Sequence, residues 1–401
     1  MALMGWTKRM MEEADERGFW GTGDVVCVDH LSPELAGFVT ARRGDDFSCV
    51  ACESTSSEMF ELDELLDVAV GVLRTYWLDA NEHLYRDSDS DSGWALIDPV
   101  TADELVRNEI FAGDVDDALL EILARPDLLG EEQWFDPGQL WLEGRELIAY
   151  SWSAFHHWAV HQPEGADLVA ISARPVNLFD LSGEAADGID PKHMLSRLTE
   201  LVEAHVGLTA VPTSHTWHRA LPLEPGELPT PARLGSAPDA RAKANRMSAK
   251  GTSMFYGADD PSTAWEEIRP GSSDRIVIGR WHPARPLKML DLVKLAEPPS
   301  FFAWENATVR IGIKSLEAFA EALSLPIMPG HEGEYRSTQA FTEYLRHHLP
   351  GIDGIIYRSS ITSRPCCVVF ADNAACDPYS ERPVLLELEE FSEHAFRGAT
   401  P

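Results

Sequence analysis

Two closely spaced pairs of potential metal ligands constrain the fold of this chain more than any other feature of its sequence. Cys27 and His30 form the first pair, and Cys49 and Cys52 form the second. Each pair can lie on one tight turn, and a fold that brings the two turns together supplies the tetrahedral ligand set that zinc prefers. The alternative is a group of ordinary buried thiols beside a chance histidine. A site with four protein ligands leaves no position for water or substrate, so the predicted zinc is structural.

Length, charge and cysteine content exclude several classes of protein. A chain of 401 residues can form two or three domains, and six cysteines are too few for a disulfide scaffold. The 66 acidic residues against 33 Lys and Arg give a net charge of −33, which opposes binding to nucleic acid. No run of 18 or more apolar residues occurs, and the N-terminus lacks the apolar core of a secretory signal. We therefore expect a cytoplasmic protein with neither a nucleic-acid nor a membrane partner.

The periodicity of apolar residues predicts an α+β protein. Apolar residues recur at helical spacing in two segments, at positions 62, 65, 66, 69, 73, 76 and 77 and again at 195, 198, 201 and 202. Short β-prone runs appear at 275–281 and 366–370, between stretches of helical character. The middle of the chain is therefore predicted to be helical, and the last third to mix helices and strands.

Four places in the last 190 residues combine polar groups with unusual local sequence. They are Arg219 beside Trp217, Arg246 in a turn that leads to Tyr256, the segment 260–267, and Ser359 after Asp353. In the third of these, Asp260 and Pro261 predict the start of a helix that carries Glu266 and Glu267. Taken singly, these residues are typical of surface charges and solvated helix faces.

Taken in order, the four places resemble the RES domain family, in which arginine, glutamate and serine recur in this arrangement. The matching positions are Arg219, Arg246, Tyr256, Glu267 and Ser359, and the segment from Tyr335 to Gln339 resembles the one that introduces the penultimate helix of the family. The first part of the chain is similar to the HEPN/RES N-terminal domain. The expected domains are a zinc-ribbon-like segment at 1–56, a helical HEPN-like domain at 57–205, the RES domain at 206–380 and a C-terminal tail at 381–401.

The resemblance implies that NAD is consumed as a substrate, on a mixed α/β fold related to ADP-ribosyltransferases. Glu267 would stabilise positive charge on the ribose as nicotinamide leaves. Arg219 and Arg246 would bind the dinucleotide, because arginine presents a planar fork of donors to phosphate oxygens. Tyr256 would stack on nicotinamide, and Ser359 would hydrogen-bond the substrate or orient the carboxylate. Arg246 and Ser359 are thus candidate catalytic and NAD-binding residues alike.

Several alternatives stay open at the level of sequence. The choice of Glu267 over Glu266 rests on register along the helix, and an error of one residue would move the carboxylate to another face. Family members often have asparagine at the start of the last core strand, where this chain has Cys366 or Cys367. A second zinc position that is commonly cysteine is His30 here, which zinc accepts.

Three functions are compatible with this sequence. The first is a hydrolase or phosphorylase of the nicotinamide–ribose bond, an NAD glycohydrolase acting as a growth-arresting toxin or defence effector in a toxin–antitoxin system. The second is an ADP-ribosyltransferase that modifies a macromolecule, and the third is a zinc-containing interaction protein whose RES domain is inactive. By analogy with the family, the expected partners are a protein antitoxin or other regulator and a second copy of the chain.

Overall fold

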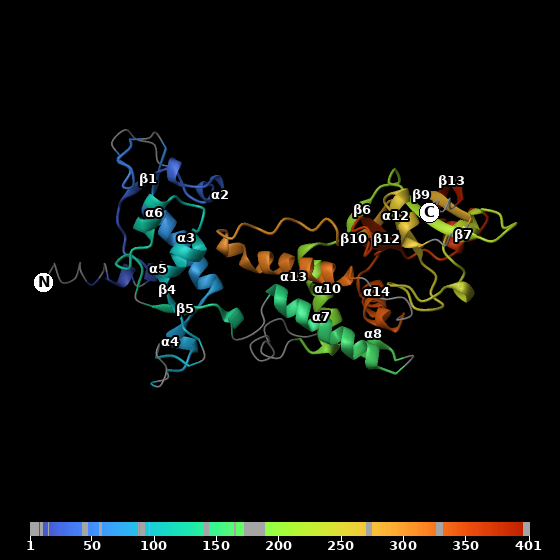
Figure 1. The fold of residues 1–401 in the computed structure, drawn as a ribbon, viewed down its shortest axis with the longest axis horizontal. Helices are drawn as coiled ribbons and strands as arrows, with labels where there is room; N and C mark the ends of the chain where they lie inside the picture. The colour runs from blue at the N-terminus through green and yellow to red at the C-terminus, as the bar shows by residue number, and fades with distance from the viewer. Residues whose placement is uncertain are drawn as a thin grey trace, which may run out of the picture. The chain divides into compact units, whose positions relative to one another are not determined.

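The chain forms two compact units, which are treated separately below (Figure 1). Unit 1 comprises Met1–Glu143 and Pro298–Arg310, and unit 2 comprises Gly144–Glu297 and Ile311–Pro401. Both combine helices with strands, which confirms the predicted α+β class. The computed structural model describes residues 8, 11–14, 16–41, 47–55, 58–86, 88, 93–95, 97–130, 132–139, 144–163, 166–171, 189–269, 275–325 and 332–395.

Unit 1 packs short helices and two small sheets around one long helix. Its strands are β1 (Val25–Cys27), β2 (Met59–Glu61), β3 (Leu78–Asp79), β4 (Val100–Thr101) and β5 (Gln133–Phe135). Its helices are α2 (Pro33–Ala36), α3 (Leu62–Tyr76), α4 (Ala80–His83), α5 (Ala102–Leu105) and α6 (Asp117–Leu123). The strands pair antiparallel, β1 with β2, and β5 with both β3 and β4. These elements hold both the predicted metal ligands and a pocket described below.

Helix α3 supplies the centre of the core of unit 1, as its apolar spacing predicts. It buries one continuous face, Leu62, Leu65, Leu66, Ala69 and Leu73 among others. The segment 298–310 completes this core from a distant part of the sequence. Phe302 is 4% exposed and packs against Phe38 and Phe111, while Phe301 stacks on Tyr76 at 4.8 Å between ring centroids. Aromatic burial thus joins this segment to unit 1 rather than to its neighbours in the chain.

Unit 2 is built on an eight-stranded sheet with the order β13-β9-β7-β8-β12-β11-β10-β6. Adjacent strands are antiparallel except for β10 and β11, which are parallel. The strands are β6 (Thr209–Val211), β7 (Trp217–Leu223), β8 (Phe255–Ala258), β9 (Arg275–Pro283), β10 (Leu287–Asp291), β11 (Gly354–Arg358), β12 (Pro365–Val369) and β13 (Leu386–Ala395). The predicted runs at 275–281 and 366–370 correspond to β9 and β12.

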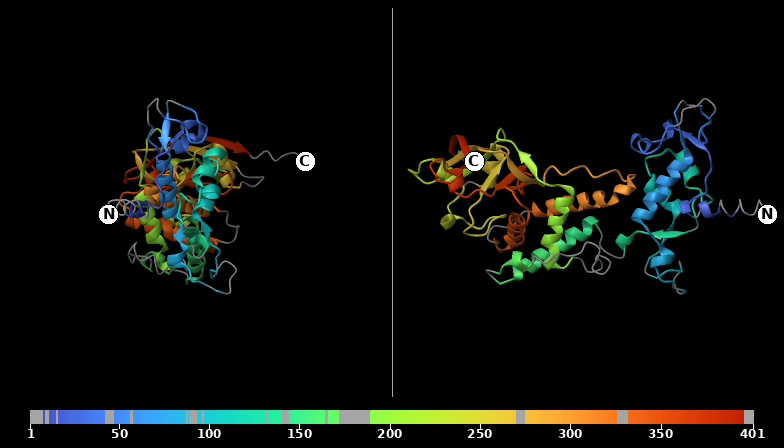
Figure 2. Two further views of the ribbon diagram at one scale, coloured as in Figure 1. Left: turned by 90° about the vertical axis from the view of Figure 1, so that its left-hand side faces the viewer. Right: turned by 180° about the vertical axis from the view of Figure 1, so that it is seen from behind.

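The helices of unit 2 mostly lie beside the strands of its sheet in Figure 1 and in the right-hand view of Figure 2, but the helix at Pro261–Glu267 overlaps the strands in both. They are α7 (Gly144–His161), α8 (Leu168–Ile171), α10 (Met194–His205), α11 (Pro231–Leu234), α12 (Pro261–Glu267), α13 (Ala307–Leu323) and α14 (Arg336–His348). The first residues of α13, up to Arg310, belong to unit 1. Side chains of α7, α10, α13 and α14 share a core with one face of the sheet, including Cys366 and Val368. Cys367 and Val369 lie in a second core on the other face, because successive strand residues point to opposite sides.

The spatial units do not follow the predicted domain limits along the chain. Helices α7 and α10, placed by sequence in the segment 57–205, pack in unit 2 because their apolar faces share its main core. The segment 381–401, expected to be a tail, includes β13, which pairs with β9 from Leu386 to Ala395. No helix among the described residues is both long and apolar enough to cross a membrane.

Candidate functional site

A pocket of about 280 Å³ opens in unit 2 where the sheet divides between β7 and β8. These neighbouring strands are paired only at His218 and Ala258, whereas β7 is paired with β9 from Trp217 to Leu223. Helix α12 packs against both β7 and β8, and its residues Ala264 and Glu267 line the pocket. The pocket is lined by His218, Arg219, Ala220, Leu221, Asn245, Tyr256, Gly257, Ala258, Ala264, Glu267, Ile268, Tyr357 and Cys366.

Arg219 on β7 bridges the division of the sheet. Its Nη1 donates a hydrogen bond of 2.7 Å to the backbone carbonyl of Tyr256 on β8. Its Nε is buried and has no hydrogen-bond partner among the described residues. Burial lowers the pKa of this guanidinium, but arginine remains charged at neutral pH. A buried charged donor without an acceptor is costly, and an anionic ligand in the pocket would satisfy it.

Tyr256 on β8 also lines the pocket and is fixed through its hydroxyl group. That hydroxyl lies 2.8 Å from Oγ of Ser248, which is itself buried. Burial raises the pKa of Tyr256 to about 12, against the opposing effect of the Ser248 hydrogen bond. The phenol therefore stays neutral and holds its ring in one orientation, which suits a stacking surface.

Glu267 ends helix α12, whose N-terminus has the structure that its sequence predicts. Asp260 is the N-cap and accepts the backbone N–H of Thr263 at 2.9 Å, with Pro261 in the first turn. The register of this helix brings Glu267, and not Glu266, to the pocket lining. The hydroxyl of Ser359 donates to Oε1 of Glu267 at 2.5 Å.

Ser359 lies behind the pocket lining and is 2% exposed. Its Oγ accepts the backbone N–H groups of Ile361 at 3.1 Å and Thr362 at 3.0 Å. With two N–H donors directed at it, the hydroxyl has its proton available for Glu267. The geometry therefore favours the second of the two roles considered for Ser359, the orientation of the carboxylate.

Arg246 lies beside the pocket instead of lining it. Its Nη1 donates to the carbonyls of Leu323 at 2.6 Å and Leu325 at 2.8 Å, at the end of α13. The preceding residue, Asn245, does line the pocket. Two donors of Arg246 are thus occupied by backbone carbonyls, and the other three N–H groups of the guanidinium face no described acceptor.

The segment from Tyr335 to Gln339 positions this turn. Gln339 Nε2 donates to the carbonyls of Asn245 at 2.8 Å and Ser248 at 3.1 Å, and the hydroxyl of Thr338 donates to the carbonyl of Arg246. The first turn of α14 therefore fixes the loop that carries Asn245 and, through Ser248, the ring of Tyr256.

Four lining residues with polar or sulfur-containing side chains were not among the candidate site residues: His218, Asn245, Tyr357 and Cys366. The alternation of β12 separates the two neighbouring cysteines, since Cys366 faces the pocket and Cys367 faces the opposite core. Burial raises the pKa of the Cys366 thiol, so the side chain is a neutral surface of the pocket. Alternation along CCVVF could have indicated this, but only with the orientation of the sheet known.

In unit 1, the structure brings the four predicted metal ligands together. The ligand atoms of Cys27, His30, Cys49 and Cys52 all lie within 4.8 Å of one another, so the cluster could hold a metal ion. The sulfur atoms of Cys27 and Cys52 are 3.7 Å apart. A tetrahedral zinc with Zn–S bonds of about 2.3 Å requires sulfur atoms about 3.8 Å apart, which this spacing fits.

Neighbouring groups orient His30 and lower the pKa of Cys49, and both effects favour metal binding. Nδ1 of His30 lies 2.6 Å from Oδ2 of Asp116, and the buried Nε2 has no hydrogen-bond partner among the described residues. A carboxylate on one ring nitrogen fixes the other as a ligand. Burial would raise the pKa of Cys49, but backbone N–H groups, first that of Cys27, outweigh it and lower the pKa to about 7. The cluster could therefore hold a metal ion through three sulfur atoms and one imidazole nitrogen.

Two family models match parts of this chain. Residues 216–388 match the model of the RES domain, and residues 42–164 match HEPN/RES N-terminal domain 1. The chain is also similar to one in the crystal structure of the M. tuberculosis MbcT–MbcA toxin–antitoxin complex, with 15% identity over 49% of this chain and 91% of that chain, at a TM-score of 0.30. No curated protein matches the sequence. The RES match contains all five candidate site residues of unit 2.

Proposed function

We propose that this chain, which contains a RES domain preceded by a HEPN/RES N-terminal domain, cleaves the bond between nicotinamide and ribose in NAD. The resemblance to the RES family implies an NAD-consuming enzyme. The observation that carries the proposal is the carboxylate of Glu267, held by Ser359 in a pocket that also contains Arg219 and Tyr256.

The proposed reaction breaks the bond between the ribose C1′ and the nicotinamide nitrogen. The electron pair of that bond passes to nicotinamide, which leaves as a neutral ring, and the sugar gains oxocarbenium character. Glu267 stabilises the growing positive charge. A water molecule then bonds to C1′ and gives up a proton, or phosphate bonds there in its place. Ser359 is the proposed positioning residue, since its hydroxyl fixes the direction of the carboxylate.

Proposed contacts with the dinucleotide divide between the two arginines. Arg219, with a buried Nε that lacks a partner, is suited to a pyrophosphate oxygen within the pocket. Arg246 would use the donors that the carbonyls of α13 leave free, at the rim beside Asn245. Tyr256, whose hydroxyl is held by Ser248, offers its ring to nicotinamide.

We further propose that the enzyme is a growth-arresting toxin or defence effector, restrained by a protein antitoxin or other regulator and stabilised by structural zinc at Cys27, His30, Cys49 and Cys52. Transfer of ADP-ribose to a macromolecule would use the same donor site, and the two activities differ in the acceptor alone. An inactive interaction protein would keep the pocket without turnover.

Release of nicotinamide from NAD by the purified full chain, measured with and without phosphate, tests the proposal. The expected result is release, with ADP-ribose as product in plain buffer and ADP-ribose 1-phosphate if phosphate is the acceptor. Transfer would instead leave ADP-ribose attached to a protein or nucleic acid. Bound NAD that stays intact with the folded, zinc-loaded protein would refute catalysis.

A further inference from the structure

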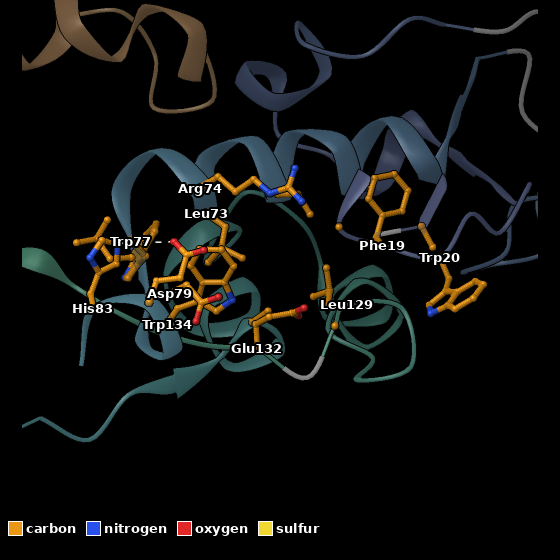
Figure 3. Close-up of a pocket in the computed structure, with 17 residues that line it drawn as sticks. Phe19, Trp20, Leu73, Arg74, Trp77, Asp79, His83, Leu129, Glu132 and Trp134 are labelled. Atoms are coloured by element: carbon orange, nitrogen blue, oxygen red, sulfur yellow. Dashed lines mark ion pairs between the residues drawn. The ribbon is translucent and has the colours of Figure 1, made fainter. Parts of the chain in front are cut away.

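Unit 1 contains a second pocket, of about 400 Å³, that the proposed reaction does not use (Figure 3). Its walls come from α3, the strands β3 and β5, and the segment around Phe19. Three tryptophans line it, namely Trp20, Trp77 and Trp134, and so do three carboxylates, Asp79, Glu82 and Glu132. The lining is thus aromatic and acidic at once.

The pairing of two short strands creates this combination. Asp79 on β3 lies directly opposite Trp134 on β5. Trp77 directly precedes β3 and Glu132 directly precedes β5, and both line the pocket with Asp79 and Trp134. Phe135, which follows Trp134, is buried in a small hydrophobic core, whereas Leu78 both packs against that core and lines the pocket. One face of the sheet therefore presents indole rings and carboxylates side by side, as Figure 3 shows for Asp79, Trp134 and Glu132.

The carboxylates of this pocket exceed the cations that face them. Arg74 is at the Phe19 end in Figure 3, where its Nη1 donates to the carbonyl of Glu16 at 3.2 Å. His83 lies 4.0 Å from Glu82. Within the described part of the chain, neither Asp79 nor Glu132 forms an ion pair with a basic side chain. The end of the pocket near Trp134 therefore has negative charge that no cation among the described residues neutralises.

The carboxylate of Glu132 lies against the backbone at Gly130. A Cβ atom added at Gly130 would lie 1.9 Å from Oε2 of Glu132, so the acid occupies space that only glycine leaves open. Asp79 is fixed in turn as the N-cap of α4, where Oδ1 accepts the N–H of Asn81 at 2.7 Å. Its other oxygen, Oδ2, is left for a ligand.

We propose that this pocket binds a guanidinium group. A planar guanidinium can stack on an indole face and donate paired hydrogen bonds to a carboxylate, which is the combination that Trp134, Asp79 and Glu132 offer. An anionic ligand would be repelled by the same acids, and an uncharged apolar ligand would bury them without partners. The group comes either from a small molecule or from an arginine side chain of a protein.

Calorimetric titration of the full chain in about 0.15 M salt tests this inference, because that salt screens diffuse attraction to an acidic surface. The probes are n-butylguanidinium, the neutral n-butanol, the anionic butyrate and a blocked Gly-Arg-Gly peptide. Saturable binding of n-butylguanidinium to one site, without binding of n-butanol or butyrate, is expected. If the peptide binds more tightly than n-butylguanidinium, the guanidinium group is assigned to an arginine of a protein partner. If the two bind equally, it is assigned to a small molecule.

Three variants locate the binding. Glu132→Gln removes one charge, Gly130→Ala keeps that charge but displaces the carboxylate, and Asp117→Asn removes an exposed charge of α6 outside the pocket. The first two should weaken binding of n-butylguanidinium by about tenfold or more, and the third should leave it unchanged. No saturable binding, or an equal loss in Asp117→Asn, would overturn the proposal. Because the probes lack NAD, the outcome is independent of the activity of unit 2.

Discussion

Replacing Ser359 by alanine tests how the candidate site holds its carboxylate. The side chain of Ser359 makes three hydrogen bonds, one to Glu267 and two from backbone N–H groups, and it is 2% exposed. At about 1 kcal/mol for each bond, Ser359→Ala should lower the free energy of unfolding by about 3 kcal/mol. Urea denaturation of the two proteins measures that difference.

The effect of Ser359→Ala on catalysis should be separable from its effect on stability. Without its hydroxyl donor Glu267 can turn away from the reacting carbon, and a displacement on the order of 1 Å costs about 10²-fold in rate. We therefore expect kcat for nicotinamide release to fall by about that factor, with a much smaller change in KM, under conditions where both proteins are folded.

A double-mutant cycle decides whether Ser359 acts through Glu267. In the background of Glu267→Ala, the further change Ser359→Ala should reduce kcat no more, because the group that it positions is already absent. If the two losses multiply instead, Ser359 contacts the substrate itself, and the positioning role is refuted.

Three further predictions follow from contacts outside the pocket. Asp116→Asn should weaken zinc binding by about 10–100-fold in competition with a chromophoric chelator, and an unchanged affinity would contradict the orienting role of its carboxylate on His30. Phe302→Ala should cost about 3–5 kcal/mol of stability in denaturant, whereas a cost below about 1 kcal/mol would argue against burial of segment 298–310 in unit 1. Burial would raise the pKa of Asp260, but hydrogen bonds from Ser262 and Thr263 outweigh it and lower the pKa from 3.8 to about 2. The ionised group therefore stabilises the fold above about pH 4 and loses this effect as the pH falls through 2. Urea titrations should show the difference in unfolding free energy between the wild type and Asp260→Asn shrinking over that pH window. A difference that stays constant would contradict the lowered pKa.

Local sequence patterns predicted much of the framework of the site. The apolar spacing of α3 and the cap at Asp260 depend on neighbours within one or two turns of helix, and both elements form where expected. The spacing within each ligand pair was also informative, because each pair fits one turn. The cluster then needs just one long-range contact, between the two turns. In each case the information lies within a few residues of sequence.

Features that depend on non-local packing could not be predicted in this way. The direction of Arg246 follows from the end of α13, more than 70 residues later, whose carbonyls accept its N–H groups. The pocket of unit 1 exists because Asp79 is paired with Trp134, and neither strand is long enough to show alternation by itself. The burial of Phe302 in unit 1 likewise depends on partners that are remote in the chain.

The side-by-side comparison of Glu267→Gln and Glu266→Gln tests the central claim most directly. Both changes remove one charge from adjacent positions at the end of α12, but only Glu267 lines the pocket and accepts the hydroxyl of Ser359. We predict that Glu267→Gln lowers kcat for nicotinamide release by at least about 10²-fold, as expected for an electrostatic group at the reacting centre, while Glu266→Gln stays within about twofold of the wild type. Equal losses in the two variants, or full activity of Glu267→Gln, would contradict the account.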